Sequence, residues 1–345
     1  MTVLTSTNPT LYDWINTHNP KGEIAQIAEV LNQTNETDDF ATVLQANDTT
    51  SHQTTVRTGF PTVYWRSLNQ GVLPSKSTKA TVRESIALVE SRAEVDQVLA
   101  DLGGDPNGFR WSESVAHLES MAQELQSTLL YGNPAGEPNV FMGLAPRYSS
   151  TTAGNGENVL LGGSATESVN TSVWLIGWAP GKVYKVFPRG MEKYAGIYHE
   201  DLSVYDAQDV NGVAGTRMRV YGSLFRSMTG LVVEDWRYAV RIANLQVSAL
   251  TALSGVHAPT VFTNLLHLME QAIVRMPQLG GARFTFVANR TVCSALRRLA
   301  LEKSTSALSI EASANQFGTP RQRLSYQGIP VALCDQLLNT EALVS

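Results

Sequence analysis

The sequence predicts an α+β protein in which helices and strands are mixed along the chain. Apolar residues at helical spacing indicate three helices, over 112–131, 259–276 and 291–303. Short apolar or alternating runs indicate strands over 172–178, 182–187, 217–224, 231–245 and 283–287. At 345 residues, of which 43% are hydrophobic, the chain is long enough for about two domains and a sizeable core.

The helix over 112–131 is the most completely marked element of the chain. Ser112 is placed to cap its N-terminus, and Gly132 and Pro134 end it. Its apolar positions recur at helical spacing at Val115, Leu118, Met121, Ala122, Leu125 and Leu129. A helix of about twenty residues is about 30 Å long, so we expect this one to span a domain.

Residues 1–50 have the pattern of an arm that has no core of its own. One short apolar stripe predicts a helix within 22–33, and a single helix of this kind cannot bury its face alone. The stretch 34–52 is rich in Thr, Asn, Asp and Gln, which is typical of a linker. Two interpretations are open, a loose terminus or an arm that docks on another subunit.

The stretch 54–95 predicts a long β-hairpin. A strand that includes 56–65 is followed by a turn over 67–77 and a returning strand over 81–89. A projecting two-stranded hairpin is marginally stable in water unless its faces are covered. We expect it to lie on a partner surface, although folding back onto its own domain is the alternative. The candidate contact residues combine aromatic and basic side chains: Arg57, Phe60, Tyr64, Trp65, Arg66, Lys76, Lys79 and Arg83.

The remaining segments predict a mixed body. Residues 94–100 indicate a short helical piece, and 190–215 indicate a Gly-rich loop. In 231–245, apolar and charged positions alternate, so one face of that strand is expected to pack and the other to expose charge. The packing positions are Trp236, Tyr238, Val240 and Ile242, and they alternate with Asp235, Arg237, Ala239 and Arg241.

Towards the C-terminus, Pro259 is suited to the first position of a helix, and Asn289 is suited to cap the next one. A polar loop is expected over 304–320. Two short extended segments then follow, 323–326 and 328–331.

Composition narrows the function classes. A formal net charge of −5 argues against a concentrated basic surface for nucleic acid, although it does not exclude contact with DNA. Cys293 and Cys334 are far apart in the sequence and lack CxxC spacing, so neither a disulfide framework nor a zinc site is indicated. Residues 1–20 lack the apolar run of a signal peptide, and no segment is apolar for long enough to cross a membrane. We expect a soluble protein of a reducing compartment.

The sequence offers no catalytic, cofactor-binding or metal-binding constellation. The stretch 177–182 has the wrong glycine spacing for a phosphate-binding loop, and Val183 stands where a hydroxyl residue should meet magnesium. The six histidines show no HExxH spacing, and Ala207 interrupts the acidic pattern of a calcium loop. An arm, an uncovered hairpin and a spanning helix instead favour a subunit that neighbours complete.

The order of these segments resembles the major capsid proteins of tailed bacteriophages, particularly those with podovirus-type heads. The residues that carry the resemblance follow the hairpin and the long helix: 131–134 (Tyr-Gly-Asn-Pro), 141–148 (Phe-Met-Gly-Leu-Ala-Pro-Arg-Tyr), 231–244 and 326–331. The resemblance implies an HK97-like capsid fold. Its parts would be an N-terminal arm (1–50), an extended loop (51–95), a peripheral domain (96–155 and 216–247) with the spine helix 112–131, and an axial domain (156–215 and 248–345).

The resemblance also implies a function. A major capsid protein self-assembles into pentamers and hexamers of an icosahedral head, which encloses double-stranded DNA without reading its sequence. The expected partners are further copies of the chain, a portal protein, and a scaffolding or cement protein. The expected location is the virion shell, assembled in the cytoplasm of a host bacterium, with no membrane and no cofactor.

Some members of this fold crosslink a lysine of the extended loop to an asparagine of a neighbour. Lys76 and Lys79 lie in the corresponding loop, but no matching Asn or catalytic Glu is identifiable, so no crosslink is expected. In the commoner members, the helix, strand and helix of the axial domain precede the long peripheral strands. Here 217–245 precedes 259–303, so the topology is reordered if the strands are matched correctly.

Three other classes are weighed against the capsid protein. One is another phage head or tail protein, which would form rings or tubes. The second is an enzyme with an unrecognised site, and the third is a ligand-binding module that is stable as a monomer.

Overall fold

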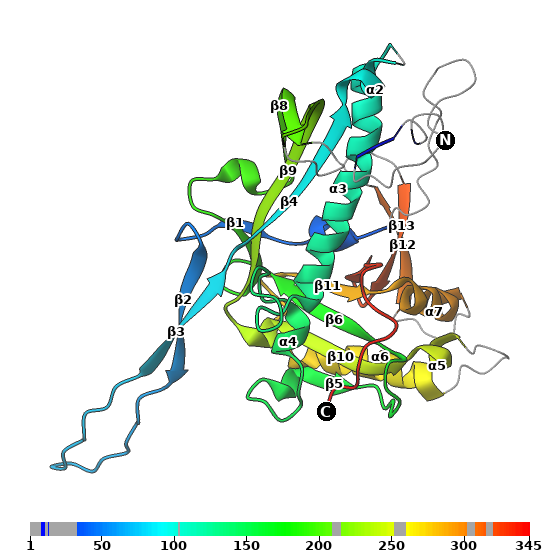
Figure 1. Ribbon diagram of the computed structural model, residues 1–345. Coiled ribbons are helices and arrows are strands. Elements are labelled where there is room, and N and C mark those ends of the chain that lie inside the picture. The colour runs from blue at the N-terminus through cyan, green and yellow to red at the C-terminus, as the bar shows by residue number, and fades with distance from the viewer. Residues whose placement is uncertain are drawn as a thin grey trace.

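The structure, a computed structural model, describes residues 8–10, 13, 33–102, 104–208, 215–251, 260–301, 308–314 and 320–345. Figure 1 shows a body of sheet and helices from which one hairpin projects far to one side, while the long helix α3 runs along the body. The helices are α2 (Gln97–Asp101), α3 (Pro106–Tyr131), α4 (Leu144–Arg147), α5 (Val247–Thr251), α6 (Thr260–Arg275) and α7 (Arg290–Leu301).

The strands belong to one large branched sheet and one separate hairpin. The hairpin pairs β2 (Ser51–Gly59) with β3 (Thr78–Ser85). The large sheet contains β1 (Val43–Gln45), β4 (Ala87–Asp96), β5 (Val159–Leu161), β6 (Asn170–Trp178), β7 (Val183–Phe187), β8 (Tyr198–Gln208), β9 (Arg217–Val233), β10 (Ala239–Gln246), β11 (Arg283–Ala288), β12 (Leu308–Ala314), β13 (Pro320–Tyr326) and β14 (Ile329–Leu333).

The centre of the body is β6, which is flanked by β10 and β11, both antiparallel to it. Every residue of β6 is buried, because the sheet is covered on both faces there. Helices α6 and α7 contribute apolar side chains to the same cluster, among them Leu265, Met269, Leu296 and Leu299. This cluster is the main core of the described chain.

Strand β9 connects the body to a second region, formed by β4, β8 and the rest of β9, which lies toward the top of Figure 1. Its C-terminal end pairs with β7, and the rest of its length pairs with β4 on one side and β8 on the other. Helix α3 covers this region, but the apolar clusters beneath it are small. One contains Val95, Leu99, Ala100 and Phe109, and the other contains Ala93, Met121 and Phe225.

Helix α3 begins six residues before the predicted cap. Its N-terminal cap is Asp105, whose carboxylate accepts a hydrogen bond from the Gly108 amide at 3.0 Å, and Pro106 occupies the first turn. Ser112 lies inside the helix, where its hydroxyl donates to the Phe109 carbonyl at 2.9 Å. The assignment of Ser112 as the cap was therefore wrong, whereas the C-terminal end at Tyr131 was predicted correctly.

The hairpin is shorter in regular structure than predicted. Strand β2 ends at Gly59 rather than continuing to Trp65, because Pro61 has no amide hydrogen and its ring restricts the residue before it. The returning segment is two strands, β3 and β4, which divide at Ile86. Strand β4 then continues to Asp96 in pairing with β9, so the helical piece expected from residue 94 begins only at Gln97.

Three segments expected to be loops or linkers contain strands instead. Residues 198–208 form β8 on the edge of β9, residues 43–45 form β1 on the edge of β7, and residues 308–314 form β12 against β13. Local residue patterns did not reveal these three strands. Conversely, the two strands expected at 217–224 and 231–245 are divided differently: β9 runs unbroken to Val233, and β10 starts only at Ala239.

The C-terminal elements confirm the predictions. Strand β11, helix α7, β13 and β14 lie where expected, and the Asn289 side chain caps α7 by accepting from the Val292 amide at 3.0 Å. Helix α6 is described from Thr260, so the role assigned to Pro259 lies outside the described residues, as does the helix predicted within 22–33.

Candidate assembly surface

The hairpin presents its predicted contact residues to solvent. Beyond the paired strands, residues 60–77 form an extended tip, which Figure 1 shows far from the rest of the chain. In this tip Trp65 is 104% exposed and Phe60 is 86% exposed, which is rare for such large apolar side chains. The alternative in which the hairpin folds back onto its own domain is therefore wrong.

The basic candidates lie along the same element. Arg57 and Lys79 face each other in the β2–β3 register, and Arg83 donates to the Gln53 side chain at 3.3 Å. Arg66, in the tip, donates to the Gln70 carbonyl at 3.0 Å, and Lys76 is exposed near the C-terminal end of the tip segment. The structure thus brings all eight candidates onto one projecting ribbon, with their aromatic members grouped at 60–65.

A buried ion pair fixes the root of this ribbon. The Arg147 guanidinium donates to both carboxylate oxygens of Glu84, at 2.6 and 2.7 Å. Both side chains are almost fully buried, and Arg147 also donates to the carbonyls of Gly143, Met142 and Leu231. Because Glu84 belongs to β3 and Arg147 ends α4, the pair sets the hairpin against the body.

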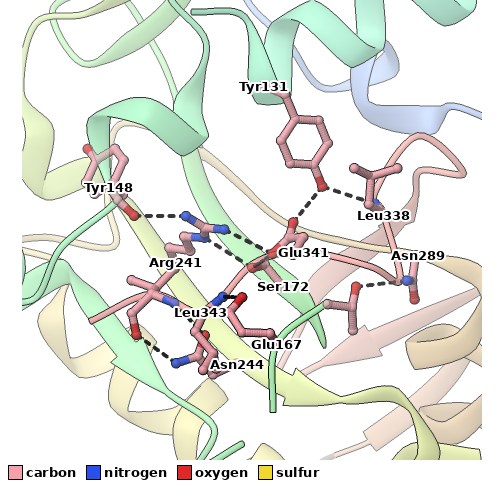
Figure 2. A network of polar contacts seen from close by, with 12 residues as sticks. Tyr131, Tyr148, Glu167, Ser172, Arg241, Asn244, Asn289, Leu338, Glu341 and Leu343 are labelled. Carbon is pink, nitrogen blue, oxygen red and sulfur yellow. Dashed lines mark hydrogen bonds and ion pairs between the residues drawn. The ribbon is translucent and has the colours of Figure 1, made fainter. Parts of the chain in front are cut away.

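The residue after Arg147 leads to a second buried network, shown in Figure 2. The Tyr148 carbonyl accepts from the Arg241 guanidinium at 3.0 Å, and the Tyr148 hydroxyl donates to the Trp236 carbonyl at 2.7 Å. Arg241 also forms an ion pair with Glu341 at 3.0 Å. The alternation in the sequence predicts Arg241 on an exposed face of its strand; this prediction is wrong, because β10 is covered on both faces and Arg241 is 5% exposed.

Glu341 is the centre of this network. It accepts hydrogen bonds from the hydroxyls of Tyr131 and Ser172, in addition to the Arg241 pair. Burial and the neighbouring carboxylate raise the pKa of Tyr131, so this hydroxyl keeps its proton and remains a donor. The C-terminal segment is thereby joined to α3, β6 and β10 at once.

Backbone contacts extend this attachment to the end of the chain. The Asn244 side chain exchanges two hydrogen bonds with the backbone of Val344, at 2.8 and 2.9 Å, and the Glu341 amide donates to the Asn170 carbonyl at 2.9 Å. Sequence reasoning missed this cluster. The apolar residues on both faces of 239–245 were the available sign that Arg241 would be buried.

The described ranges show no arrangement suited to a metal ion, since no three His, Cys, Asp or Glu side chains in them converge. Burial raises the pKa of the Cys293 thiol to about 12 and also raises that of Cys334, so both are held as protonated, free thiols.

A cavity of about 450 Å³ lies at the N-terminal end of α7, where Arg290 and Asp335 are paired with each other.

Helices of the described chain are all too short or too polar to span a bilayer.

The fold is that of a phage capsid subunit. It is similar to the structure of bacteriophage Epsilon15, with a TM-score of 0.76 and 28% sequence identity over 100% of this chain and 99% of that one. A second similar structure is the capsid of bacteriophage JBD30, with a TM-score of 0.49 and 12% identity over 90% of this chain and 95% of that one. Among curated proteins, no sequence matches.

The sequence profile of the family described as Major capsid protein GP7 matches residues 19–345. The chain therefore belongs to the GP7 family of major capsid proteins. It has the HK97-like fold and serves as a structural protein of a tailed-phage capsid, in which many copies form a shell and become part of the virion.

Proposed function

We propose that this chain assembles into pentamers and hexamers of an icosahedral head that encloses double-stranded DNA, and that the hairpin is its main contact with a neighbouring subunit. The observation that carries the proposal is the exposed aromatic tip on a rigidly held root. Isolated tryptophan and phenylalanine side chains in water are unfavourable, and burying their area contributes roughly 25 cal/mol per Å². Repeated around a shell, even weak contacts become collectively stable.

The remaining roles follow from this proposal. The eight candidate residues of the hairpin bury against the next subunit, with aromatic anchors at the centre and arginines and lysines at the rim. A portal protein, and a scaffolding or cement protein, complete the head. With a net charge of −5, the shell holds DNA without binding it tightly or by sequence. Assembly takes place in the cytoplasm of a host bacterium.

We assign the domains in the same framework. Residues 1–50 form the arm, 51–95 the extended loop, 96–155 with 216–247 the peripheral domain, and 156–215 with 248–345 the axial domain. The thin core under α3 supports placing 96–155 in a region that neighbouring subunits complete.

The test is electron microscopy of particles formed by the full chain after recombinant expression. Wild-type protein should give closed shells or capsomers. Trp65→Ala should abolish or strongly reduce them and leave the unfolding midpoint of the free subunit unchanged, because the Trp65 side chain is fully exposed in the subunit. Trp236→Ala is the control for the loss of a tryptophan away from the hairpin, because Trp236 lies on the body and is 36% exposed. A normal particle yield from Trp65→Ala would contradict the assigned contact.

A further inference from the structure

Basic residues gather in one stretch of this acidic chain. Residues 275–323 contain seven arginines, one lysine and two glutamates, so their formal net charge is +6, whereas the whole chain carries −5. Helix α7 lies in this stretch and packs against β12, β13 and β14. Figure 1 shows α7 on the side of the body away from the hairpin. The overall charge therefore does not describe this region, which is basic.

One face of α7 carries a row of hydrogen-bond donors. Arg290, Ser294 and Arg298 are spaced four residues apart, so they follow one another along one face of the helix. Thr291 lies beside this row, and all four side chains line the cavity of about 450 Å³ next to α7. The wall that α7 gives to the cavity is therefore made of guanidinium and hydroxyl groups.

Arg298 is a donor without a partner. Its Nε atom is buried from solvent and has no hydrogen-bond acceptor among the described residues. A buried nitrogen of a charged group that lacks an acceptor costs free energy. An anion with several oxygens, bound in the cavity, supplies that acceptor.

The cavity has an excess of positive charge. Asp335 is the only acidic residue among the described residues that line it, and Arg290 pairs with it at 2.5 Å. Arg298 then remains as an uncompensated cation of the lining, and the neighbouring Arg297 is exposed beside it. The sign of the charge favours an anionic ligand.

A phosphate group matches these donors. Guanidinium groups bind phosphate oxygens through short, charge-assisted hydrogen bonds. Serine and threonine hydroxyls also donate to phosphates in nucleic-acid interfaces, and such contacts carry no sequence information. The chemistry of the α7 face is therefore that of a sequence-independent contact with a phosphate backbone.

We propose that the face of α7 that carries Arg290, Ser294 and Arg298 binds the phosphate backbone of the enclosed DNA. The proposal rests on this chain forming a shell around DNA, and it adds the surface through which a subunit touches that DNA. The hairpin is also basic, but its cations lie on the ribbon whose aromatic tip is assigned to a subunit contact. Each α7 contact is weak and salt-dependent, and it is repeated over the many copies of the shell.

Binding of a short fluorescent DNA duplex to the full chain, measured by anisotropy over a range of salt concentrations, tests the assignment. Arg298→Gln should weaken binding by about tenfold and reduce the dependence of log K on log salt by about one, because one phosphate contact is lost. Asp335→Asn should strengthen binding, because it frees Arg290 and removes an acid from the lining. Two duplexes of unrelated sequence should behave alike.

Arg217→Gln is the matched control. Arg217 is exposed on β9, outside the basic stretch, and its substitution removes the same charge, so the affinity should stay close to that of the wild type. Arg298→Gln should still form particles in wild-type yield by electron microscopy, which separates DNA binding from assembly. Circular dichroism and unfolding midpoints verify that each variant folds.

Several outcomes would overturn the α7 site. Equal losses from Arg298→Gln and Arg217→Gln would show a general charge effect. If Lys76→Glu with Lys79→Glu abolishes duplex binding that Arg298→Gln leaves intact, the hairpin is the DNA surface. If Arg298→Gln loses particles but keeps duplex affinity, the cavity is a subunit contact.

Two further results separate the ligand and the proposed function. Binding of inorganic phosphate through Arg298 without any duplex binding would make the cavity a site for the free anion and overturn the DNA assignment. A wild-type chain that binds the duplex through Arg298 but forms neither shells nor capsomers would overturn the proposed function and leave the α7 site standing.

Discussion

Arg147 and Glu84, which are 63 positions apart in the sequence, form a bidentate ion pair buried between the body and the root of the hairpin. The guanidinium is further satisfied by backbone carbonyls on both sides. A buried pair of this kind adds little net stability when complete, but losing one partner is costly, because the other charge is left without compensation. It therefore holds the direction of the projecting ribbon more than it stabilises the fold.

Replacing Glu84 with Gln should lower the free energy of unfolding by about 3 kcal/mol, because the Arg147 charge remains buried and unpaired. Chemical denaturation of the free subunit measures this loss. The control is Glu90→Gln, which removes a half-exposed partner of Arg226; because Arg226 is itself part-exposed and keeps Glu200, this change should cost less than about 1 kcal/mol. Equal losses from the two variants would show that the Glu84 pair has no special role.

The cap of α3 gives a second prediction. Asp105→Ala should lower the free energy of unfolding by about 1 kcal/mol, because the Gly108 amide loses its acceptor at the helix start. Ser112→Ala should change it much less, since the Ser112 hydroxyl only duplicates a contact inside the helix. Urea unfolding with an unchanged m-value measures both, and the reverse ranking would contradict the observed start of α3.

The contrast between these two residues shows how far local sequence signals reach. Ser112 precedes an apolar stripe and satisfies the cap pattern, but Asp105 with Pro106 satisfies it too, and the chain uses the earlier pair. Helix α7 with its Asn289 cap has no competing start, and there the prediction is confirmed. Local patterns identify elements, but they do not choose between two adequate boundaries.

The errors at β8 and Arg241 have a different cause. Strand β8 is a polar edge strand, and it is ordered by ladder bonds to β9 rather than by apolar alternation. Arg241 is buried because Glu341, 100 positions later, meets it in the core. Such contacts depend on tertiary partners that a single sequence does not reveal. The exposure of the hairpin side chains could be predicted, because it does not depend on finding a distant partner in the fold.

His117 gives a pH dependence whose sign is defined. It lies on α3, contacts the Ser91 hydroxyl at 2.6 Å, and stacks on Phe225. Burial lowers its pKa below the ordinary value of 6.5, so the folded protein disfavours the charged imidazole. The unfolded chain binds the proton more readily, so this contribution to stability is complete above pH 6.5 and is lost as the pH falls below it.

We expect the free energy of unfolding to decrease with falling pH below 6.5, with a slope from His117 of at most about 1.4 kcal/mol per pH unit. His117→Gln should remove this part of the slope. Burial also lowers the pKa of His52, so a residual slope of the same sign remains in the variant. Denaturation curves from pH 8 to about 5 measure the difference, and identical slopes in both proteins would contradict the assignment.

The Arg241–Glu341 pair gives the last prediction, because it attaches the C-terminal segment to the core (Figure 2). Arg241→Met should lower the free energy of unfolding by about 3–5 kcal/mol, since the Glu341 carboxylate is left buried without a cation. Arg290→Met, which removes an exposed partner of Asp335, should cost less than about 1 kcal/mol.

The double variant Arg241→Met with Glu341→Leu should lose less stability than the sum of the two single variants, because no buried charge remains. Recovery should be partial, since the hydroxyls of Tyr131 and Ser172 lose their acceptor. Chemical denaturation of all four proteins completes the double-mutant cycle, and carboxypeptidase digestion reports release of the C-terminal segment. Strictly additive losses would mean that Arg241 and Glu341 stabilise the subunit independently, and the attachment would then have to rest on the Asn244–Val344 backbone contacts.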